Sequence, residues 1–149
     1  MDQKLIVACP SCDTKNAVPA SRLGDHGKCG NCGKPLFQAH PLALTEARFQ
    51  RHAAESDIPL AVDFWADWCG PCKMMAPAYE ASANELEPHV RLIKLNSDNE
   101  QAVAARLGIR GIPTMILFHG GREIARTSGA MTAGQIVKWV RDRLPTVAA

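Results

Sequence analysis

The chain has 149 residues, a formal net charge of +2 and an apolar content of 46%. This length suits one ordinary domain with a small additional module, and the apolar content is that of a globular protein. No run approaches the roughly 18 consecutive apolar residues that a membrane-spanning helix needs. The nearly balanced charge differs from that of a nucleic-acid-binding surface. We therefore expect neither a membrane nor a nucleic-acid partner.

The N-terminal residues, Met1 to Cys9, lack the basic start and the long apolar core of a secretory signal. We therefore expect a cytoplasmic protein, in a compartment where thiols are kept reduced. The chain contains six cysteines. In a reducing compartment these are expected to bind metal or to react, rather than to form a disulfide framework.

Four of the cysteines form two Cys-x-x-Cys pairs, Cys9 with Cys12 and Cys29 with Cys32, separated by sixteen residues. This spacing is typical of a structural zinc site, in which four thiolates surround one Zn²⁺ ion. Forty residues are too few for a large core, so metal binding would supply much of their folding free energy. Two disulfides, or four free thiols on a disordered tail, are the alternatives. His26 could replace one cysteine, but we expect it in a solvated loop.

The rest of the chain alternates between strand-like and helix-like segments. Strands are predicted at 42–44, 60–65, 91–96, 115–118 and 123–127. Helices are predicted after Thr45, at the third cysteine pair, after Asp98 or Asn99, and after the capping box at Thr132. The order β-α-β-α-β-α-β-β-α indicates a mixed sheet flanked by helices, with a parallel crossover in its centre and an antiparallel last pair. We place the module at residues 1–40 and the α/β domain at 41–149.

The third cysteine pair lies where a strand meets a helix. The apolar run 60–65 leads into Cys69-Gly70-Pro71-Cys72, and Pro71 suits the first turn of a helix. Free backbone N–H groups and the positive end of the helix dipole favour a thiolate there. A Cys-x-x-Cys pair near a β-α-β pattern is typical of disulfide exchange. Half of a metal site, or two buried apolar side chains, are the alternatives.

The segment Trp68-Cys69-Gly70-Pro71-Cys72-Lys73 resembles the active-site signature of the thioredoxin family, and the resemblance covers residues 41–145. The first forty residues resemble a zinc ribbon, and a ribbon ahead of such a domain resembles the thioredoxin 2 branch. The resemblance implies the thioredoxin fold and a monomeric thiol–disulfide oxidoreductase, acting as a protein-disulfide reductase. It implies one structural zinc ion and no bound organic cofactor. It also implies client proteins with disulfides, and electrons from NADPH through a flavin-containing thioredoxin reductase.

The resemblance assigns roles to residues around the cysteine pair. Cys69 would be the exposed, attacking thiolate, and Cys72 would resolve the mixed disulfide. Asp63, an acid in an apolar strand, matches the buried aspartate of the family; burial should raise its pKa and let it accept the proton of Cys72. The alternative is an acid at the strand end, exposed to water. Lys94 matches a nearby lysine and would either tune Asp63 or lie at the surface. Trp65 is expected in the core.

A second segment, Gly111-Ile112-Pro113-Thr114, should complete the site. The resemblance implies a cis Ile112–Pro113 bond, which would leave the Ile112 backbone free to pair with an extended client. An ordinary trans proline opening a strand is the alternative. The family's flat apolar docking patch would comprise Trp68, Gly70, Pro71, Ile112, Gly129 and Ala130, and Pro113 would belong to the same substrate-binding site.

Other functions compete with reduction. The chain could instead be a disulfide oxidase or isomerase, or a redox-regulated zinc-binding chaperone or interaction protein. The ribbon could also sense oxidants by releasing zinc when its thiolates oxidise. The Gly-Pro pair between Cys69 and Cys72 resembles the reducing members of the family, which favours a reductase.

Overall fold

The computed structural model describes residues 2–144 and contains two sheets. A small sheet pairs β1 (Lys4–Ala8) with β2 (Lys15–Pro19). A larger sheet has the order β3 (Leu42–Ala43), β5 (Arg91–Asn96), β4 (Leu60–Trp65), β6 (Thr114–His119) and β7 (Arg122–Ser128). The helices are α1 (Glu46–Glu55), α2 (Gly70–Leu86), α3 (Gln101–Arg106) and α4 (Ala133–Arg143), with a short 3₁₀ turn at Ala20–Arg22. Within the described range, none is long and apolar enough to span a bilayer.

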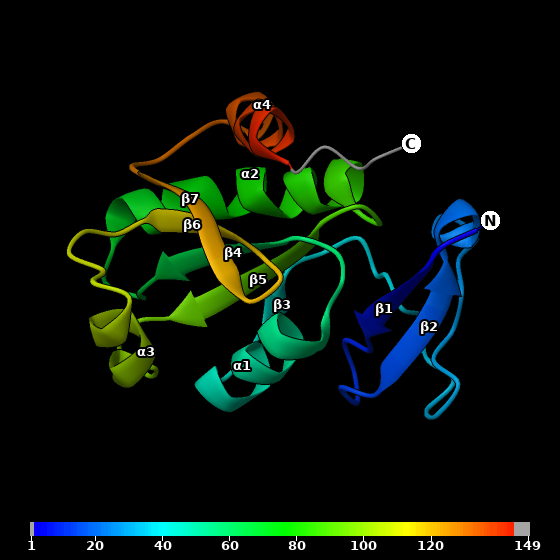
Figure 1. The fold of residues 1–149 in the computed structure, drawn as a ribbon. Coiled ribbons are helices and arrows are strands. Elements are labelled where there is room, and N and C mark those ends of the chain that lie inside the picture. The colour runs from blue at the N-terminus through cyan, green and yellow to red at the C-terminus, as the bar shows by residue number, and fades with distance from the viewer. Residues whose placement is uncertain (1, 145–149) are drawn as a thin grey trace.

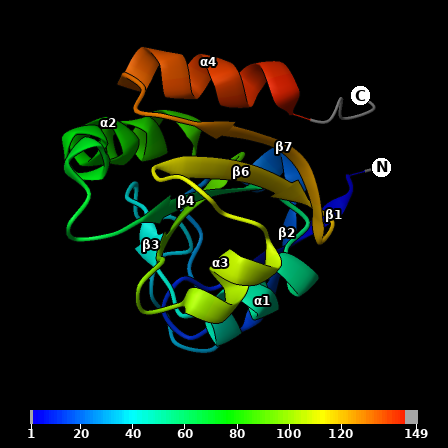
Figure 2. The ribbon, with the colours of Figure 1, turned by 90° about the vertical axis from the view of Figure 1, so that its left-hand side faces the viewer.

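The larger sheet is mixed and lies between two layers of helices. Strands β3, β5 and β4 run parallel, whereas β6 and β7 are antiparallel to their neighbours. Helices α2 and α4 cover one face and α1 and α3 the other (Figure 1). Figure 2 shows the same three layers from the side. The predicted element order, the parallel crossover and the antiparallel last pair are confirmed.

Strand β4 is central to the sheet and carries Asp63. Its first five residues are buried, because parallel and antiparallel neighbours flank it and helices cover both of its faces. In register, Asp63 lies between Lys94 on β5 and Met115 on β6. Its side chain therefore points from the middle of the sheet into one of the helix-covered faces.

The predicted helix starts are confirmed at α1 and α4 and wrong at α3. Thr45 caps α1, and Thr132 forms a capping box with Gln135 at α4. Helix α3 is instead preceded by Glu100 at its N-cap, which makes no side-chain capping bond. The side chain of Asn96 accepts hydrogen bonds from the backbone N–H groups of Asp98 and Asn99. These two residues thus belong to an Asx-type turn before the helix.

Residues 2–40, called the ribbon below, lie at one side of the larger sheet (Figure 1), and the rest of the described chain is called the body. Strand β1 was not predicted from the sequence. Beyond a small cluster of its own around Cys9, Cys29 and Leu36, the ribbon packs on the body, where Val7 and Leu23 share an apolar cluster with Ile58. The apolar residues of β1 are thus buried against another part of the chain, which a pattern confined to the first forty residues does not reveal.

Candidate active site and metal centre

The cysteine pair lies at the start of α2. Cys69 is the N-cap residue and Cys72 lies in the first turn, and the two form a disulfide with their Cα atoms 5.3 Å apart. The backbone N–H of Cys72 donates a hydrogen bond to Cys69 Sγ at 3.2 Å. This donor and the positive end of a 17-residue helix would favour negative charge on that sulfur once the disulfide is reduced.

The expectation that Cys69 is exposed is wrong for this oxidised form. Cys69 is 3% exposed and Cys72 is 2% exposed, so exposure does not distinguish the two sulfurs. Ala66 and the partly buried Trp65 and Ile112 pack around them. Trp65 itself is only half-buried, which corrects its assignment to the core. The two cysteines differ instead by position, because only Cys69 caps the helix.

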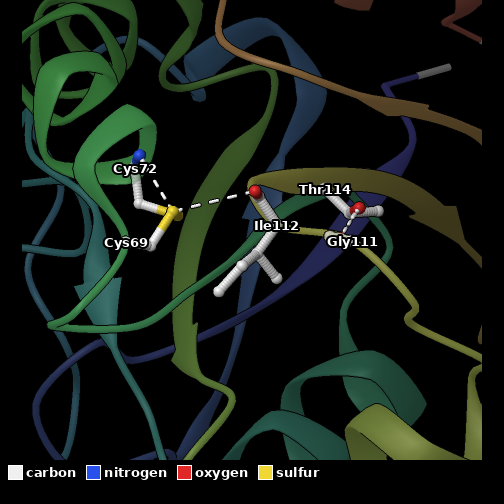
Figure 3. Close-up of a disulfide and its surroundings, with 5 residues drawn as sticks. All are labelled: Cys69, Cys72, Gly111, Ile112 and Thr114. Carbon is white, nitrogen blue, oxygen red and sulfur yellow. Dashed lines mark hydrogen bonds between the residues drawn. A yellow bond between two sulfur atoms is a disulfide. The ribbon is translucent and has the colours of Figure 1, made fainter.

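The turn before β6 lies against the disulfide, as Figure 3 shows. The carbonyl oxygen of Ile112 is 3.7 Å from Cys69 Sγ. The Ile112–Pro113 bond is cis, as expected. The hydroxyl of Thr114 donates to the carbonyl of Gly111, and the N–H of Gly129 donates to the carbonyl of Pro113 at 2.9 Å. These bonds fix the turn and bring the end of β7 beside it.

The predicted docking residues are distributed around this turn. Trp68 is 71% exposed, and Gly70, Pro71, Gly129 and Ala130 are exposed as well. Ile112 is half-buried, whereas Pro113 is buried and offers no side-chain surface to a partner. Pro113 thus contributes to this region through its backbone, which shapes the turn, because its side chain packs inward.

Asp63 is a buried carboxyl group on the α2 side of the sheet. It is 1% exposed, and among residues 2–144 its Oδ1 finds no hydrogen-bond partner. Burial raises the pKa of Asp63 to about 7, and the positive charge of Lys94 opposes this rise. Lys94 is half-buried, with its Nζ 4.5 Å from the ring centroid of Trp65. It is therefore close enough to Asp63 to act on it and is not a freely solvated lysine.

The four ribbon cysteines converge. All four Sγ atoms lie within 4.8 Å of one another, with Cys9 3.6 Å from Cys32 and Cys12 3.7 Å from Cys29. A tetrahedral zinc ion with Zn–S bonds of about 2.3 Å places its sulfurs about 3.8 Å apart. The donor set and its spacing therefore fit a closed tetrathiolate site. The exposed His26 is outside this cluster.

Hydrogen bonds to the sulfurs also suit thiolate ligands. The N–H of Ser11 donates to Cys9 Sγ and the N–H of Asn31 donates to Cys29 Sγ, each at 3.3 Å. A side-chain hydrogen bond with Thr14 lowers the pKa of Cys12 to about 6, whereas burial raises the pKa of Cys9 to about 11. Buried Cys9 would thus need a cation to stay ionised, as a metal ligand does.

Comparison with known proteins agrees with this geometry. The family model described as Thioredoxin matches residues 40–142. The chain belongs to the thioredoxin family. A zinc-ribbon model described as Thioredoxin 2, N-terminal, matches residues 8–34. Thioredoxin C-3 of Corynebacterium nephridii is 37% identical over 140 residues, which cover 94% of this chain and 96% of the relative.

Shorter thioredoxins match about two thirds to three quarters of this chain. A thioredoxin of Haemophilus influenzae is 39% identical over 103 residues, covering 69% of this chain and 96% of the relative. The structure of a mutant thioredoxin from Halobacterium salinarum NRC-1 superposes with a TM-score of 0.66 at 27% identity. The match covers 75% of this chain and 97% of that structure. The thioredoxin fold and a thiol–disulfide oxidoreductase activity follow from this membership.

Two features of the thioredoxin body were missed from the sequence. Met74, one residue beyond Lys73, is 81% exposed beside the cysteine pair. Helical spacing could have predicted this exposure, because Cys72, Met75 and Tyr79 share the buried face of α2 and Met74 does not. Arg91 at the start of β5 is only 1% exposed and contacts the ribbon, and nothing in the strand pattern predicts those contacts.

Proposed function

We propose that this thioredoxin-family protein is a protein-disulfide reductase that exchanges electrons through Cys69 and Cys72. The observation that carries the proposal is the position of Cys69: it caps α2, accepts a hydrogen bond from the Cys72 N–H, and forms a disulfide with Cys72. A sulfur in this environment is a good thiolate and a good leaving group.

The proposed reaction has two exchange steps. The reduced Cys69 thiolate attacks one sulfur of a client disulfide, forms a mixed disulfide and releases the other client sulfur as a thiolate. Cys72 then loses its proton and attacks Cys69, which frees the second client sulfur. One client disulfide becomes two thiols, and the protein keeps the Cys69–Cys72 disulfide that the structure contains.

Asp63 is the proposed acceptor of the Cys72 proton. A carboxyl group with a pKa of about 7 is partly ionised at neutral pH and gives the proton up again readily. A pocket of about 410 Å³ lined by Trp65, Lys94 and Asn96 brings solvent to Lys94, which lies in register with Asp63. We propose that Lys94 tunes Asp63 and that this pocket connects the carboxyl group with bulk water.

Clients are proposed to bind across the turn beside the disulfide. The half-buried Ile112 lies against Cys69, so an extended client segment pairing with its backbone would present a disulfide to that sulfur. Exposed Trp68 and the exposed Gly70, Pro71, Gly129 and Ala130 would frame the segment. The cis Pro113 would hold the turn rather than touch the client.

The ribbon, residues 1–40, is proposed to bind one structural Zn²⁺ through Cys9, Cys12, Cys29 and Cys32, ahead of a thioredoxin domain at 41–149. The close approach of the four sulfurs supports this ligand set. A redox-responsive role is the second candidate, because Cys32 is the exposed ligand and offers oxidants a route to the cluster. Zinc retained at peroxide doses that leave residues 41–149 folded would rule that role out.

The electron donor is proposed to be an NADPH-dependent thioredoxin reductase, and the clients are disulfide-bonded proteins. We expect the chain, with such a reductase and NADPH, to reduce insulin disulfides catalytically. We expect the Cys69–Cys72 pair to have a potential near the roughly −270 mV of reducing thioredoxins. A potential near the roughly −180 mV of protein disulfide isomerase, together with no insulin turnover, would favour oxidase or isomerase work instead.

A further inference from the structure

Two arginines of the thioredoxin body hold the first cysteine knuckle of the ribbon, residues 8–13. Arg48 on α1 binds the carboxylate of Asp13 through Nε, at 3.1 Å to Oδ1 and 3.0 Å to Oδ2, and through Nη2, at 2.8 Å to Oδ1. The same Nη2 donates to the carbonyl of Pro10 at 2.8 Å. His52, one turn further along α1, places Nε2 2.9 Å from Asp13 Oδ1.

The second arginine, Arg91 on β5, is 1% exposed. Its Nη2 donates to the carbonyl of Ala8 at 3.2 Å and to that of Leu36 at 2.7 Å. Its Nη1 pairs with Glu87 at 3.1 Å, and its guanidinium carbon lies 4.5 Å from the ring centroid of Phe37. The ribbon thus satisfies part of a buried charge that belongs to the body.

The positions of these contacts relative to the ligands are specific. Ala8 and Pro10 flank Cys9, and Asp13 directly follows Cys12. Asp13 has a φ of 65° and its N–H donates to the carbonyl of Cys9 at 3.0 Å, which closes the knuckle. The body therefore holds the backbone on both sides of Cys9 and at the end of the turn that carries Cys12.

The second cysteine knuckle, residues 29–33, is stabilised by hydrogen bonds within the ribbon. Asn16 on β2 accepts from the N–H of Gly30 at 2.9 Å, and its Nδ2 lies 3.5 Å from Cys29 Sγ. The N–H of Gly33 closes this turn on the carbonyl of Cys29 at 2.9 Å. The ribbon's own bonds close both knuckles, and the first knuckle is in addition held by donors from the body.

We propose that Arg48 and Arg91 are positioning residues for the metal site, so that the thioredoxin body sets part of the zinc affinity of the ribbon. By fixing the first knuckle, the two arginines remove disorder that zinc binding would otherwise have to overcome. Coupling of this kind is reciprocal, so bound zinc strengthens the attachment of the ribbon to α1 and β5. The inference rests on the proposed zinc site.

The test compares zinc dissociation constants of full-length variants by competition with a chromophoric chelator. Arg48→Gln should bind zinc about 10–100-fold more weakly, the loss expected when a residue that positions the metal ligands is removed. Arg51→Gln, a matched change at an exposed position of the same helix, should leave the constant unchanged. The zinc dissociation constant of Arg48→Lys should lie between these two, because lysine keeps the positive charge but cannot bind the carboxylate through two N–H groups as the planar guanidinium does.

A double-mutant cycle separates positioning from general damage. Asparagine tolerates a positive φ, so Asp13→Asn removes the charge without straining the knuckle. If Arg48 acts through Asp13, the double variant should bind zinc no more weakly than Arg48→Gln alone. Circular dichroism checks that each body is folded. Zinc affinity of Arg48→Gln within about twofold of the parent overturns this inference alone, whereas a parent chain that binds no zinc overturns the zinc site as well.

Discussion

Asp63 illustrates how one residue connects sequence, burial and chemistry. An acid inside the apolar run 60–65 predicts a buried carboxyl group, and the structure confirms its burial. In the folded chain desolvation raises its pKa to about 7, well above the value of 3.8 for a free side chain. The same shift that suits Asp63 for proton transfer must then reduce the stability of the folded protein.

The pH dependence of stability tests this shift. The folded state binds more protons than the unfolded state between about pH 4 and about pH 7, so the contribution of Asp63 to stability falls as the pH rises through that range. Asp63→Asn removes the ionisation and should stabilise the oxidised protein at about pH 8 by on the order of 4 kcal/mol.

Urea unfolding at two pH values measures the effect. The difference between Asp63→Asn and the parent should be large at about pH 8 and should shrink near pH 4, where the parent carboxyl is largely protonated in the folded state and partly protonated in the unfolded state. Asp67→Asn, a change at an exposed acid near the same strand, serves as the control. Equal stabilisation by Asp63→Asn at both pH values would contradict a raised pKa.

The sequence predicts the position of Cys69 at a helix start but not its burial. The spacing and the proline identify the pair as the start of a helix, because both signals are local. The burial of Cys69 depends on Ile112, which lies 43 residues away in the chain. A residue pattern does not specify how closely the turn at Ile112 approaches Cys69.

At the scale of elements, α2 joins the two functional regions. Its N-cap is Cys69, and its C-cap is Glu87, which accepts a hydrogen bond from the N–H of Ala39 in the ribbon at 2.8 Å. Glu87 also pairs with Arg91, and both side chains are nearly inaccessible. The redox pair and the ribbon thus lie at opposite ends of one 17-residue helix.

The buried ion pair should dominate the stability of this end of α2. Arg91→Met removes the guanidinium donor from Glu87 Oε2 and from two ribbon carbonyls and should reduce the free energy of unfolding by about 3–5 kcal/mol. Lys138→Met breaks the exposed pair with Asp142 on α4 and should cost less than about 1 kcal/mol. Guanidinium unfolding of both variants with zinc present compares them.

The stability lost in Arg91→Met should depend on whether the charge of Glu87 remains. Methionine fills much of the volume of arginine, so a well-packed replacement of a buried charge can be tolerated when its partner is also removed. Arg91→Met with Glu87→Gln should therefore recover part of the loss. An Arg91→Met variant as stable as Lys138→Met would contradict a structural role for the buried pair.

At the scale of the whole molecule, the sequence predicted the two parts better than their junction. Element order, helix caps and cysteine spacing are local properties, and the structure confirms the thioredoxin fold and the convergence of four cysteines. The junction consists of contacts between residues far apart: Arg91 reaches Leu36 and Ala8, 55 and 83 positions away. Strand β1 was missed for the same reason, because its apolar residues are buried against the body.

Val7 and Leu23 of the ribbon are buried against Ile58 of the body, so the ribbon does not rely on its own core alone. A module of forty residues with a small core of its own relies on metal, on another surface, or on both. Here the described contacts supply the surface: an apolar cluster, a buried arginine and a bidentate ion pair. The ribbon thus packs against the body and is not connected to it by a flexible linker alone.

The most direct test of the central claim is a trapping experiment at the cysteine pair. Reduced Cys72→Ser protein is mixed with a disulfide-bonded peptide, and the covalent adduct is located by mass spectrometry after proteolysis. Because Cys69 attacks and the resolving thiol is absent, a stable mixed disulfide should accumulate at Cys69, and Cys69→Ser should form no adduct at Cys72. Adducts on Cys72 in the Cys69→Ser variant, with none on Cys69 in the Cys72→Ser variant, would contradict the assignment of the attacking sulfur.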